Sequence, residues 1–314
     1  MSIKRIGVLT SGGDSPGMNA AIRAVVRAAL YNGLEVYGIK RGFAGLLNEE
    51  IEPMSSLSVG GIINRGGTIL RSARCEEFKT PEGLQKGAAI LDKYGIDALA
   101  IIGGDGSMRG GVELSRISPV KVMGLPGTDY SIGFDTAVNT ALEAIDKVRD
   151  TAYSHERVFV IEVMGRHKGF IALEVGLAGG AEAILIPEVP YDLVDLLDKL
   201  RDSYERGKRS SIIVVAEGAA RAEDVKKFLQ EHTPYHLRAL VLGHMQRGGS
   251  PTAFDRVLAT QLGVFAVQRL LDGHTNEMVG VEGGRLVAVP IEYIHTATKT
   301  IDLRKLEVAS MMAI

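Results

Sequence analysis

Short runs of β-branched residues alternate with longer stretches of helical period along this chain, and this alternation constrains the fold more than any other feature. Residues 6–9 form an apolar run before the stretch 18–30, where Ala21, Ile22 and Val25 recur at spacings of three and four. Residues 81–94 have the same period and precede the apolar run 98–102. Strands alternating with helices predict mostly parallel sheets with helices on both faces, an α/β fold.

Five further apolar runs continue the alternation and predict additional strands. They are residues 120–125, 158–163, 183–186, 211–216 and 238–242, each followed by a turn with Gly, Pro or Asp. The helix at 81–94 has clear boundaries, because Thr80 and Pro81 supply an N-cap and a first-turn proline and Gly95 follows its last turn. Ligands of such sheets bind beyond the carboxyl ends of the strands, so the turns there are the candidate functional segments.

Bulk properties narrow the class of protein. A chain of 314 residues exceeds what one hydrophobic core usually serves, which predicts two packed lobes. A net charge of −2, with both signs scattered, argues against nucleic acid or an anionic membrane as a partner. Cys75 is the only cysteine, no apolar run approaches the ~20 residues of a membrane span, and the first residues show no signal segment. We therefore expect a cytoplasmic protein.

Two glycine-rich turns each follow a predicted strand and open a helix. The first, at 10–19, reads TSGGDSPGMN, and the missing Cβ atoms of Gly12 and Gly13 let backbone N–H groups approach a phosphate. The second, at 103–107, reads GGDGS and places Asp105 where it can take Mg²⁺ directly or through water. A tight turn that binds nothing, and an Asp105 that only caps its helix, are the alternatives. Together the two turns favour a nucleotide with a metal ion.

Two more turns carry basic side chains. Residues 164–169 read MGRHKG and residues 243–252 read GHMQRGGSPT, so Arg166, His244 and Arg247 suit recognition of a phosphate-bearing substrate. Glu217, after the strand at 211–216, either accepts hydrogen bonds from sugar hydroxyls or caps a helix. The remaining candidates, His155, His232 and His236, are interpreted as surface groups. Glycine turns, Mg²⁺ and arginines provide the positioning and charge neutralisation that phosphoryl transfer requires.

These four turns, in this order, resemble the bacterial 6-phosphofructokinase family over essentially the whole chain. INRGGTIL at 63–70, IGFDTAVNT at 132–140 and DKVRDTAYSHER at 146–157 extend the resemblance. It implies transfer of the γ-phosphoryl of Mg-ATP to the 1-hydroxyl of fructose 6-phosphate, the committed step of glycolysis. It also implies two Rossmann-like lobes with the site between them: residues 1–132 plus about 245–295 for ATP, and 133–244 plus about 296–314 for fructose 6-phosphate. A different kinase sharing only the GGDG turn would not explain MGRHKG or GHMQRGG.

The resemblance also implies individual residue roles. Those around ATP are Gly13, Arg74, Cys75, Gly104, Asp105, Gly106 and Ser107, with Asp105 on Mg²⁺. Those around fructose 6-phosphate are Thr128, Arg157, Met164, Gly165, Arg166, Glu217, Arg238, His244, Met245, Gln246 and Arg247. Arg74, Thr128 and Arg166 would act in catalysis, and Arg157 and Arg238 would reach across from a neighbouring subunit. Gly106 and Gly127 favour ATP over pyrophosphate, because pyrophosphate-using relatives carry bulkier aspartate and lysine there.

Members of this family are typically homotetramers with a second site for ADP-like activators and phosphoenolpyruvate-like inhibitors. The matching positions here are Arg23, Arg27, Arg149, Gly180, Glu182, Arg206, Lys208, Arg209 and Ser210. The residues by themselves favour a plainer interpretation for Arg23 and Arg27, since a helix with two exposed arginines is usually a solvated face.

The chain departs from the family pattern after the strand at 120–125. The family has a PGTIDND stretch there, with the catalytic base as its first aspartate, whereas this chain joins Pro126 and Gly127 directly to Thr128 and Asp129. Asp129 matches a later aspartate of the family, and Thr128 matches either of two threonines. Phe170, where the family commonly has aspartate, is a second departure.

Two interpretations of this departure remain open. One is an active kinase whose polypeptide contains the loop, which predicts a break between Gly127 and Thr128. The other is a catalytically dead relative that binds nucleotide and sugar phosphate, because losing a general base costs roughly 10²–10⁴ in rate.

Overall fold

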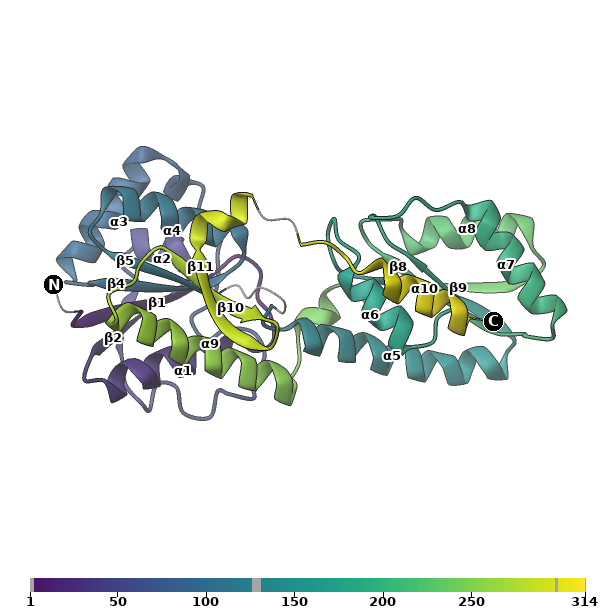
Figure 1. Ribbon diagram of the computed structural model, residues 1–314, viewed down its shortest axis with the longest axis horizontal. Helices are drawn as coiled ribbons and strands as arrows, with labels where there is room; N and C mark the ends of the chain where they lie inside the picture. Colours follow the sequence, from purple (N-terminus) through teal and green to yellow (C-terminus); the bar gives the residue numbers. More distant parts are fainter. Residues whose placement is uncertain (1–2, 126–130, 297–298, 314) are drawn as a thin grey trace. The chain divides into compact units, whose positions relative to one another are not determined.

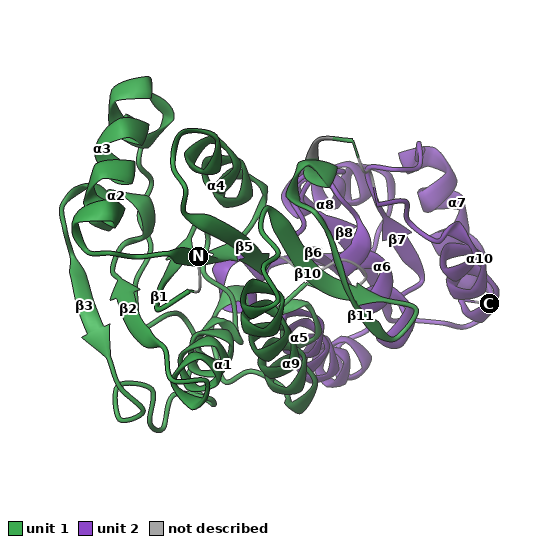
Figure 2. Cartoon of the chain, turned by 60° about the vertical axis from the view of Figure 1, so that its left-hand side comes forward, with its two compact units in different colours: residues 1–136, 247–298 green, residues 137–246, 299–314 purple. Residues whose placement is uncertain are grey.

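The computed structural model describes residues 3–125, 131–296 and 299–313, which form two compact units (Figure 2). Unit 1 comprises residues 1–136 and 247–298, and unit 2 comprises residues 137–246 and 299–314. The chain passes from unit 1 to unit 2 inside helix α5 (Phe134–Ser154) and returns between Gln246 and Arg247. Each unit has its own sheet and its own hydrophobic core.

Within the described residues, unit 1 contains a seven-stranded sheet with the order β11-β10-β5-β4-β1-β2-β3 (Figure 1). Its strands are β1 (Arg5–Ser11), β2 (Glu35–Ile39), β3 (Ile51–Met54), β4 (Ala98–Gly103), β5 (Lys121–Leu125), β10 (Glu277–Glu282) and β11 (Arg285–Pro290). Neighbours pair in parallel except at the edges, where β3 and β11 run antiparallel to β2 and β10. The central strands are continuously apolar because both faces of the sheet are covered.

Helices cover both faces of this sheet. On one face, α1 (Met18–Tyr31) and α9 (Ala253–Leu271) pack against each other and share a core with β1 and β4. The other face carries α2 (Gly42–Leu47), α3 (Pro81–Lys93) and α4 (Asp105–Ile117), with the short 3₁₀ turns η1 (Glu77–Lys79) and η3 (Ile291–His295). Unit 1 is therefore a three-layer αβα unit.

Unit 2 contains a smaller sheet, in which the described strands have the order β7-β8-β6-β9 and pair in parallel. The strands are β6 (Arg157–Val163), β7 (Ala183–Leu185), β8 (Ser211–Ala216) and β9 (His236–Val241). Helices α7 (Leu193–Glu205) and α8 (Ala222–His232) form a core with one face. Helix α6 (Phe170–Ala178) contacts β7 and β8, and α10 (Leu303–Met312) packs on α6. The 3₁₀ turn η2 (Gly243–Arg247) follows β9.

The α/β class predicted from the alternation of strands and helices is confirmed. All seven predicted strands are present, and the one expected at 238–242 begins earlier, at His236. The predicted cap of α3 is also present, since Gly83 N donates to Thr80 Oγ1 at 3.1 Å. Strands β2, β3, β10 and β11 were not predicted: β2 and β10 each contain a glycine and β3 contains a proline, whereas β11 contains an apolar run, LVAV, that was overlooked. Among the described residues, no helix combines the length and the hydrophobicity that crossing a membrane requires.

Candidate active site

The two glycine-rich turns lie side by side in unit 1. Strands β1 and β4 are parallel neighbours, with Thr10 opposite Ile102 and Ser11 opposite Gly103, so the turns leave the same edge of the sheet. The chain continues from β1 to β2 on one side and from β4 to β5 on the other. Beyond the carboxyl ends of β1 and β4 is therefore a topological switch point, where open α/β sheets bind ligands.

The two turns touch at Gly103 and Gly12. A Cβ atom at Gly103 would overlap the carbonyl oxygen of Ser11 and come within 2.7 Å of Ser107 Oγ, so only glycine fits there. The same hydroxyl is 3.6 Å from the Cβ position of Gly12. Ser107 is buried, at 4% exposure, and contributes to packing between the turns.

Backbone donors remain open at both turns. Helices α1 and α4 begin at Gly17 and Gly104, and neither of these N-cap residues has a side chain to cap the helix. In the part of the chain that the structure describes, the N–H groups of Gly13, Asp14, Asp105 and Gly106 donate no hydrogen bond. Asp105 and Gly106 are exposed, and a Cβ at Gly106 would meet nothing within 4 Å. Free backbone N–H groups in the first glycine turn and at the N-terminus of α4 are the kind of donors that bind anions.

The turn at residues 247–252, the Arg247 turn, places a cation beside these open donors. The guanidinium group of Arg247 lies against Gly13, where a Cβ atom would overlap Nη1. Ser250 Oγ donates to the carbonyl oxygen of Asn64 at 2.7 Å, so this turn also packs on the segment at 64–70. The sequence grouped Arg247 with the sugar-phosphate residues, and the structure places it beside the first glycine turn of unit 1.

The segment at 71–75 borders the same turn. Ser72 Oγ donates to the carbonyl oxygen of Gly12. Arg74 is exposed, whereas Cys75 is half-buried and packs against the core beneath α2, α3 and α4. Arg74 is thus available to a ligand through its side chain, and Cys75 lies closer to the core.

In unit 2, the predicted turn at 164–169 follows β6, but four of its backbone donors are occupied by side chains. Met164 N donates to Gln246 Oε1 at 2.8 Å, and Gly165 N and Arg166 N donate to Glu217 Oε1 at 3.1 and 2.6 Å. Gly169 N donates to both carboxylate oxygens of Glu188, at 3.1 and 3.0 Å. This turn therefore offers a ligand mainly its side chains.

Glu217 and Gln246 thus have roles in holding the turn, which residue type alone did not reveal. Gln246 is 2% exposed, and its Nε2 donates to the carbonyl oxygen of Ala137 at 3.2 Å, so both ends of its amide are used within unit 2. Arg166, His244 and Met245 are exposed. Arg166 has φ of 53°, in the left-handed region that few residues other than glycine adopt.

Arg157 and Arg238 lie on neighbouring strands β6 and β9. Phe159 is opposite Arg238 in the register, so Arg157, two residues earlier, shares a face of the sheet with Arg238. Arg157 is half-buried and Arg238 is exposed on β9, at the edge of the sheet.

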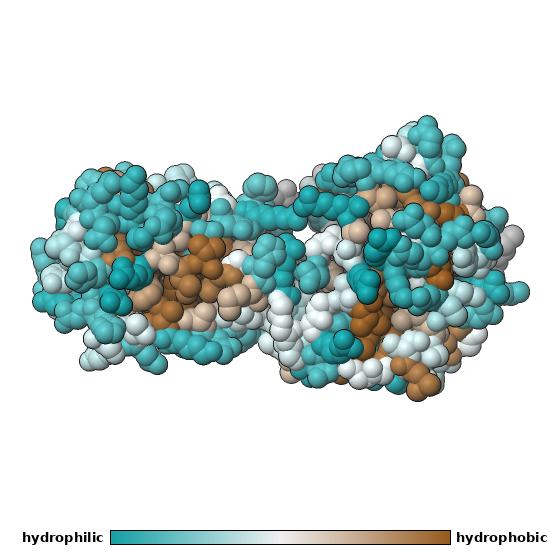
Figure 3. All heavy atoms as spheres, turned by 180° about the vertical axis from the view of Figure 1, so that it is seen from behind, coloured by the Kyte–Doolittle hydropathy of each residue, from teal (hydrophilic) through white to brown (hydrophobic). Residues whose placement is uncertain are grey.

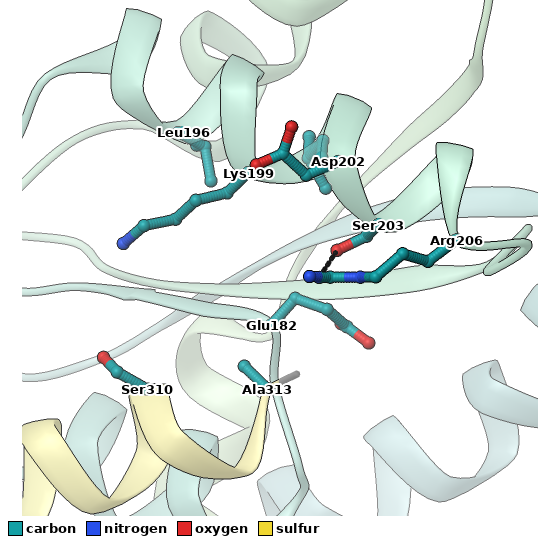
Figure 4. Close-up of a pocket in the computed structure, with 9 residues that line it drawn as sticks. Glu182, Leu196, Lys199, Asp202, Ser203, Arg206, Ser310 and Ala313 are labelled. Carbon is teal, nitrogen blue, oxygen red and sulfur yellow. Dashed lines mark hydrogen bonds between the residues drawn. The ribbon is translucent and has the colours of Figure 1, made fainter.

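Several of the predicted effector residues gather in unit 2. Lys208 Nζ is 2.6 Å from Glu182 Oε1, and the Glu182 side chain is 6% exposed and also accepts from Ile212 N. Glu182 and Arg206 line a pocket of about 210 Å³ between α7 and the end of α10, together with Leu196, Lys199, Leu200, Asp202, Ser203, Ser310 and Ala313 (Figure 4). Arg206 donates to Ser203 Oγ at 3.4 Å, which aims its guanidinium along the pocket wall (Figure 4).

The other predicted effector residues do not line this pocket. Arg149 donates to the carbonyl oxygens of Gly179 and Gly180, which fixes it in unit 2. Arg209, next to Ser210, lies 3.8 Å from the centroid of the Tyr204 ring. Arg23 and Arg27 belong to α1 of unit 1.

The junction between Gly127 and Thr128 lies outside the described residues, and so do Asp129 and the predicted roles of Thr128.

One buried residue of unit 1, Asp255, was not identified as a candidate from the sequence. Asp255, on α9, is 0% exposed and accepts hydrogen bonds from Gly133 and Thr136. A signal for it was present, because Thr252 and Asp255 have the spacing of a capping box before an apolar helix.

Comparison with known proteins identifies relatives across the chain. The family model described as Phosphofructokinase matches residues 5–270. The ATP-dependent 6-phosphofructokinase of Bacillus subtilis (strain 168) is 54% identical over 319 residues, covering 99% of this chain and 100% of the relative. That of Paenibacillus macquariensis is 52% identical and covers 100% of both chains. This alignment spans 322 positions whereas the chain has 314 residues, so some aligned positions have no residue of this chain.

Solved structures share the fold. Phosphofructokinase from Saccharomyces cerevisiae matches 99% of this chain with a TM-score of 0.89 and 36% identity, and this chain spans 48% of that one. A pyrophosphate-dependent phosphofructokinase from Marinobacter aquaeolei matches 99% of this chain and 92% of its own with a TM-score of 0.86. At 22% identity, the second likeness concerns the fold alone.

Proposed function

The chain belongs to the phosphofructokinase family, and from that premise we propose that it transfers the γ-phosphoryl of ATP to the 1-hydroxyl of fructose 6-phosphate. The products are fructose 1,6-bisphosphate and ADP. The observation that carries this proposal is the pair of glycine turns side by side at the switch point beyond β1 and β4, with open backbone donors at Gly13, Asp14, Asp105 and Gly106. Free backbone donors there suit the phosphates of a nucleotide.

In this proposal, unit 1 is the ATP-binding lobe. Gly13, Gly104 and Gly106 present backbone N–H groups to the phosphates, and Ser107 keeps the two turns together. Arg74 is exposed beside the first turn, where it would face the transferring phosphate, and Cys75 would border the nucleotide. Gly106 has open space around it, which suits ATP rather than pyrophosphate as the donor.

Mg²⁺ would arrive as part of the Mg-ATP substrate. The described residues contain no group of three or more His, Cys, Asp or Glu side chains that could cage a metal. One exposed carboxylate, that of Asp105, stands at the first turn of α4 among the open N–H groups. Mg²⁺ in kinases is commonly held by one or two carboxylates together with phosphates and water, so Asp105 fits this role. When bound, the ion neutralises charge that develops on the phosphoryl oxygens.

Unit 2 would bind fructose 6-phosphate chiefly through side chains. Arg166 and His244 are exposed near the turn at 164–169, most of whose backbone donors are occupied. Met164, Gly165, Glu217, Met245 and Gln246 shape this part of the site. Arg74 and Arg166 would stabilise negative charge on the transferring group, with Thr128 as a third candidate outside the described residues.

The named relatives support the active kinase over the second interpretation, a catalytically dead relative. That interpretation rests on the sequence alone, which lacks the PGTIDND pattern that supplies the base in this family. A chain without the base would bind Mg-ATP and fructose 6-phosphate and turn over roughly 10²–10⁴-fold more slowly.

One pair of measurements decides between them. A coupled assay of ADP formation from ATP and fructose 6-phosphate should show turnover on the order of 1–100 s⁻¹, the range of ordinary kinases. An intact mass would show whether the polypeptide has residues between Gly127 and Thr128. Binding of both substrates with turnover hundreds of times slower would establish the second function.

We also propose that the protein is a cytoplasmic, allosterically regulated homotetramer. The pocket bordered by Glu182 and Arg206 supports an effector site for ADP or phosphoenolpyruvate, with Lys208 and Arg209 adjacent. Arg157 and Arg238 would reach the active site of a neighbouring subunit. Apolar side chains gather on parts of the surface of both units (Figure 3), and Val241 on the edge strand β9 is 57% exposed and Met245 68%. Such exposed apolar groups on a sheet edge suit a contact between subunits.

A further inference from the structure

The N-terminal ends of helices α5 and α9 meet at one buried carboxylate. Asp255 Oδ1 accepts from Gly133 N at 2.9 Å, and Asp255 Oδ2 accepts from Thr136 N at 2.8 Å and from Thr136 Oγ1 at 2.5 Å. Gly133 directly precedes α5 and Thr136 is in its first turn. A side chain of α9 therefore caps α5 from a distance of more than 100 residues in sequence.

The capping is reciprocal. Thr252 is the N-cap of α9, and its Oγ1 accepts from Asp255 N at 3.3 Å and donates to Asp135 Oδ2, in the first turn of α5, at 2.6 Å. Thr252 N donates to Thr136 Oγ1 at 3.0 Å. Each hydroxyl both donates and accepts, so the two helix starts form one closed network. Thr136 is 4% exposed and Asp255 0%, so water does not substitute for these partners.

Both helices follow turns of the candidate active site. Helix α9 follows the Arg247 turn, whose guanidinium lies against Gly13. Helix α5 follows the segment after β5, and Ile132, next to Gly133, accepts a hydrogen bond through its carbonyl oxygen from Ser15 Oγ at 3.0 Å. Ser15 belongs to the first glycine turn. The network around Asp255 thus joins residues 131–133 and the turn at 247–252 to the first glycine turn.

We propose that Asp255 is a positioning residue for phosphoryl transfer. Through Gly133, Thr136 and Thr252 it holds the first glycine turn, residues 131–133 and the turn at 247–252 in the arrangement that binds the phosphates of ATP. This role rests on the proposed function, because it assumes that the glycine turns of unit 1 bind ATP. A displacement on the order of 1 Å in such a site is costly to catalysis.

The test compares Asp255→Asn with Asp192→Asn. The asparagine keeps the shape but turns an NH₂ group toward a donor, either Gly133 N–H or the Thr136 donors. Asp192 also caps a helix, accepting from Val194 N at 2.7 Å, but belongs to α7 of unit 2. Equilibrium binding of Mg-ATP, kcat and both KM values are measured at a temperature where circular dichroism shows each variant folded. We expect Asp255→Asn to raise the Kd for Mg-ATP about tenfold and to lower kcat, with Asp192→Asn within twofold of the unmodified protein.

Thr136 supplies a second test that does not depend on the folding of Asp255→Asn. Thr136→Ser keeps the hydroxyl and should retain Mg-ATP affinity, whereas Thr136→Val removes it and should weaken binding severalfold. A folded Asp255→Asn or Thr136→Val protein with unchanged Kd and kcat overturns the proposal and leaves the network a purely structural role. If the unmodified protein binds Mg-ATP without turnover, the kinase function fails, and the loss of affinity in Asp255→Asn still supports positioning.

Discussion

The glycine turns of unit 1 and the 164–169 turn of unit 2 both follow parallel strands, yet their backbone donors are used differently. In unit 1, the N–H groups of Gly13, Asp14, Asp105 and Gly106 have no partner among the described residues. In unit 2, the N–H groups at 164, 165, 166 and 169 are all bound by Gln246, Glu217 or Glu188. One site presents its backbone to a ligand, and the other uses side chains to hold its backbone still.

This difference suggests two kinds of recognition. A chain of phosphates has oxygens spaced along its length, which backbone donors and helix N-termini can match without any particular side chain. A sugar phosphate needs orientation by directed groups, and an arginine fork on a rigid turn provides it. Substitution of side chains should therefore harm ligands of unit 2 selectively, while unit 1 should be sensitive to charge placed among its open donors.

The largest effect should come from Asp105, the exposed carboxylate among the open donors of unit 1. Asp105→Asn removes the charge proposed to bind Mg²⁺ and should lower kcat/KM about 10²–10³-fold, as loss of one preorganised electrostatic group commonly does. Kinetics at several Mg²⁺ concentrations measure it, with the exposed helical Asp92→Asn as a control. Activity that is unchanged at limiting Mg²⁺ would remove Asp105 from the site.

A smaller and more selective effect is expected from Arg166 in unit 2. Arg166→Ala removes a charge-assisted contact of about 1.5–3 kcal/mol, which corresponds to a rise of roughly 10–150-fold in KM for fructose 6-phosphate. The KM for ATP should stay within twofold. Arg166→Lys keeps the charge but loses the planar guanidinium group. Its KM for fructose 6-phosphate should lie between those of the unmodified protein and Arg166→Ala. An ATP affinity that collapses while sugar affinity persists would show that the ligands are assigned to the wrong units.

Gly106→Asp tests whether a negative charge among the open backbone donors of unit 1 weakens the binding of ATP. An added side chain meets nothing within 4 Å, and aspartate in the first turn of a helix is favourable, so stability should change by less than about 0.5 kcal/mol. The carboxylate would repel the phosphates of ATP, and we expect KM for ATP to rise about tenfold. Gly106→Asn adds similar bulk without charge and should have the smaller effect. Equal losses in both variants would mean that space, not charge, matters at this position.

The sequence predicted best what depends on neighbours along the chain. The buried strands and the cap of α3 were correctly expected, because continuous β-branched runs and the Thr80-Pro81 pair act locally. The two strand pairs at the sheet edges were missed, since the edge strands β3 and β11 are each paired on one side only and owe their conformation to that pairing.

Partner choice across the sequence was not predictable from residue type. Asp255 reaches Gly133 over 122 positions and Gln246 reaches Met164 over 82, so neither partner is readable from spacing. Glu217 illustrates the limit, because a carboxylate after a strand suited sugar hydroxyls equally well before the structure showed it bound to Gly165 and Arg166. Family resemblance, not residue pattern, supplied the individual roles that the experiments above now test.

The smallest effect concerns the pH dependence of stability at Asp255, in the network that joins the turns of unit 1. Burial raises the pKa of Asp255 above its ordinary value of 3.8, the hydrogen bonds from Thr136 and Gly133 oppose the rise, and the charge of Asp135 adds to it. The folded protein therefore binds this proton more tightly than the unfolded chain, so the group stabilises the fold most below pH 3.8 and loses that contribution as the pH rises through the raised pKa.

The asparagine side chain of Asp255→Asn does not titrate, so this variant lacks the pH-dependent contribution. The difference in free energy of unfolding between the unmodified protein and Asp255→Asn should thus fall with rising pH in that window, by at most about 1.4 kcal/mol per pH unit. Urea unfolding across the acidic range measures it, with Asp192→Asn as the baseline for replacing a capping aspartate. A difference that grows with pH would mean that the three donors outweigh burial and that the carboxylate is held ionised.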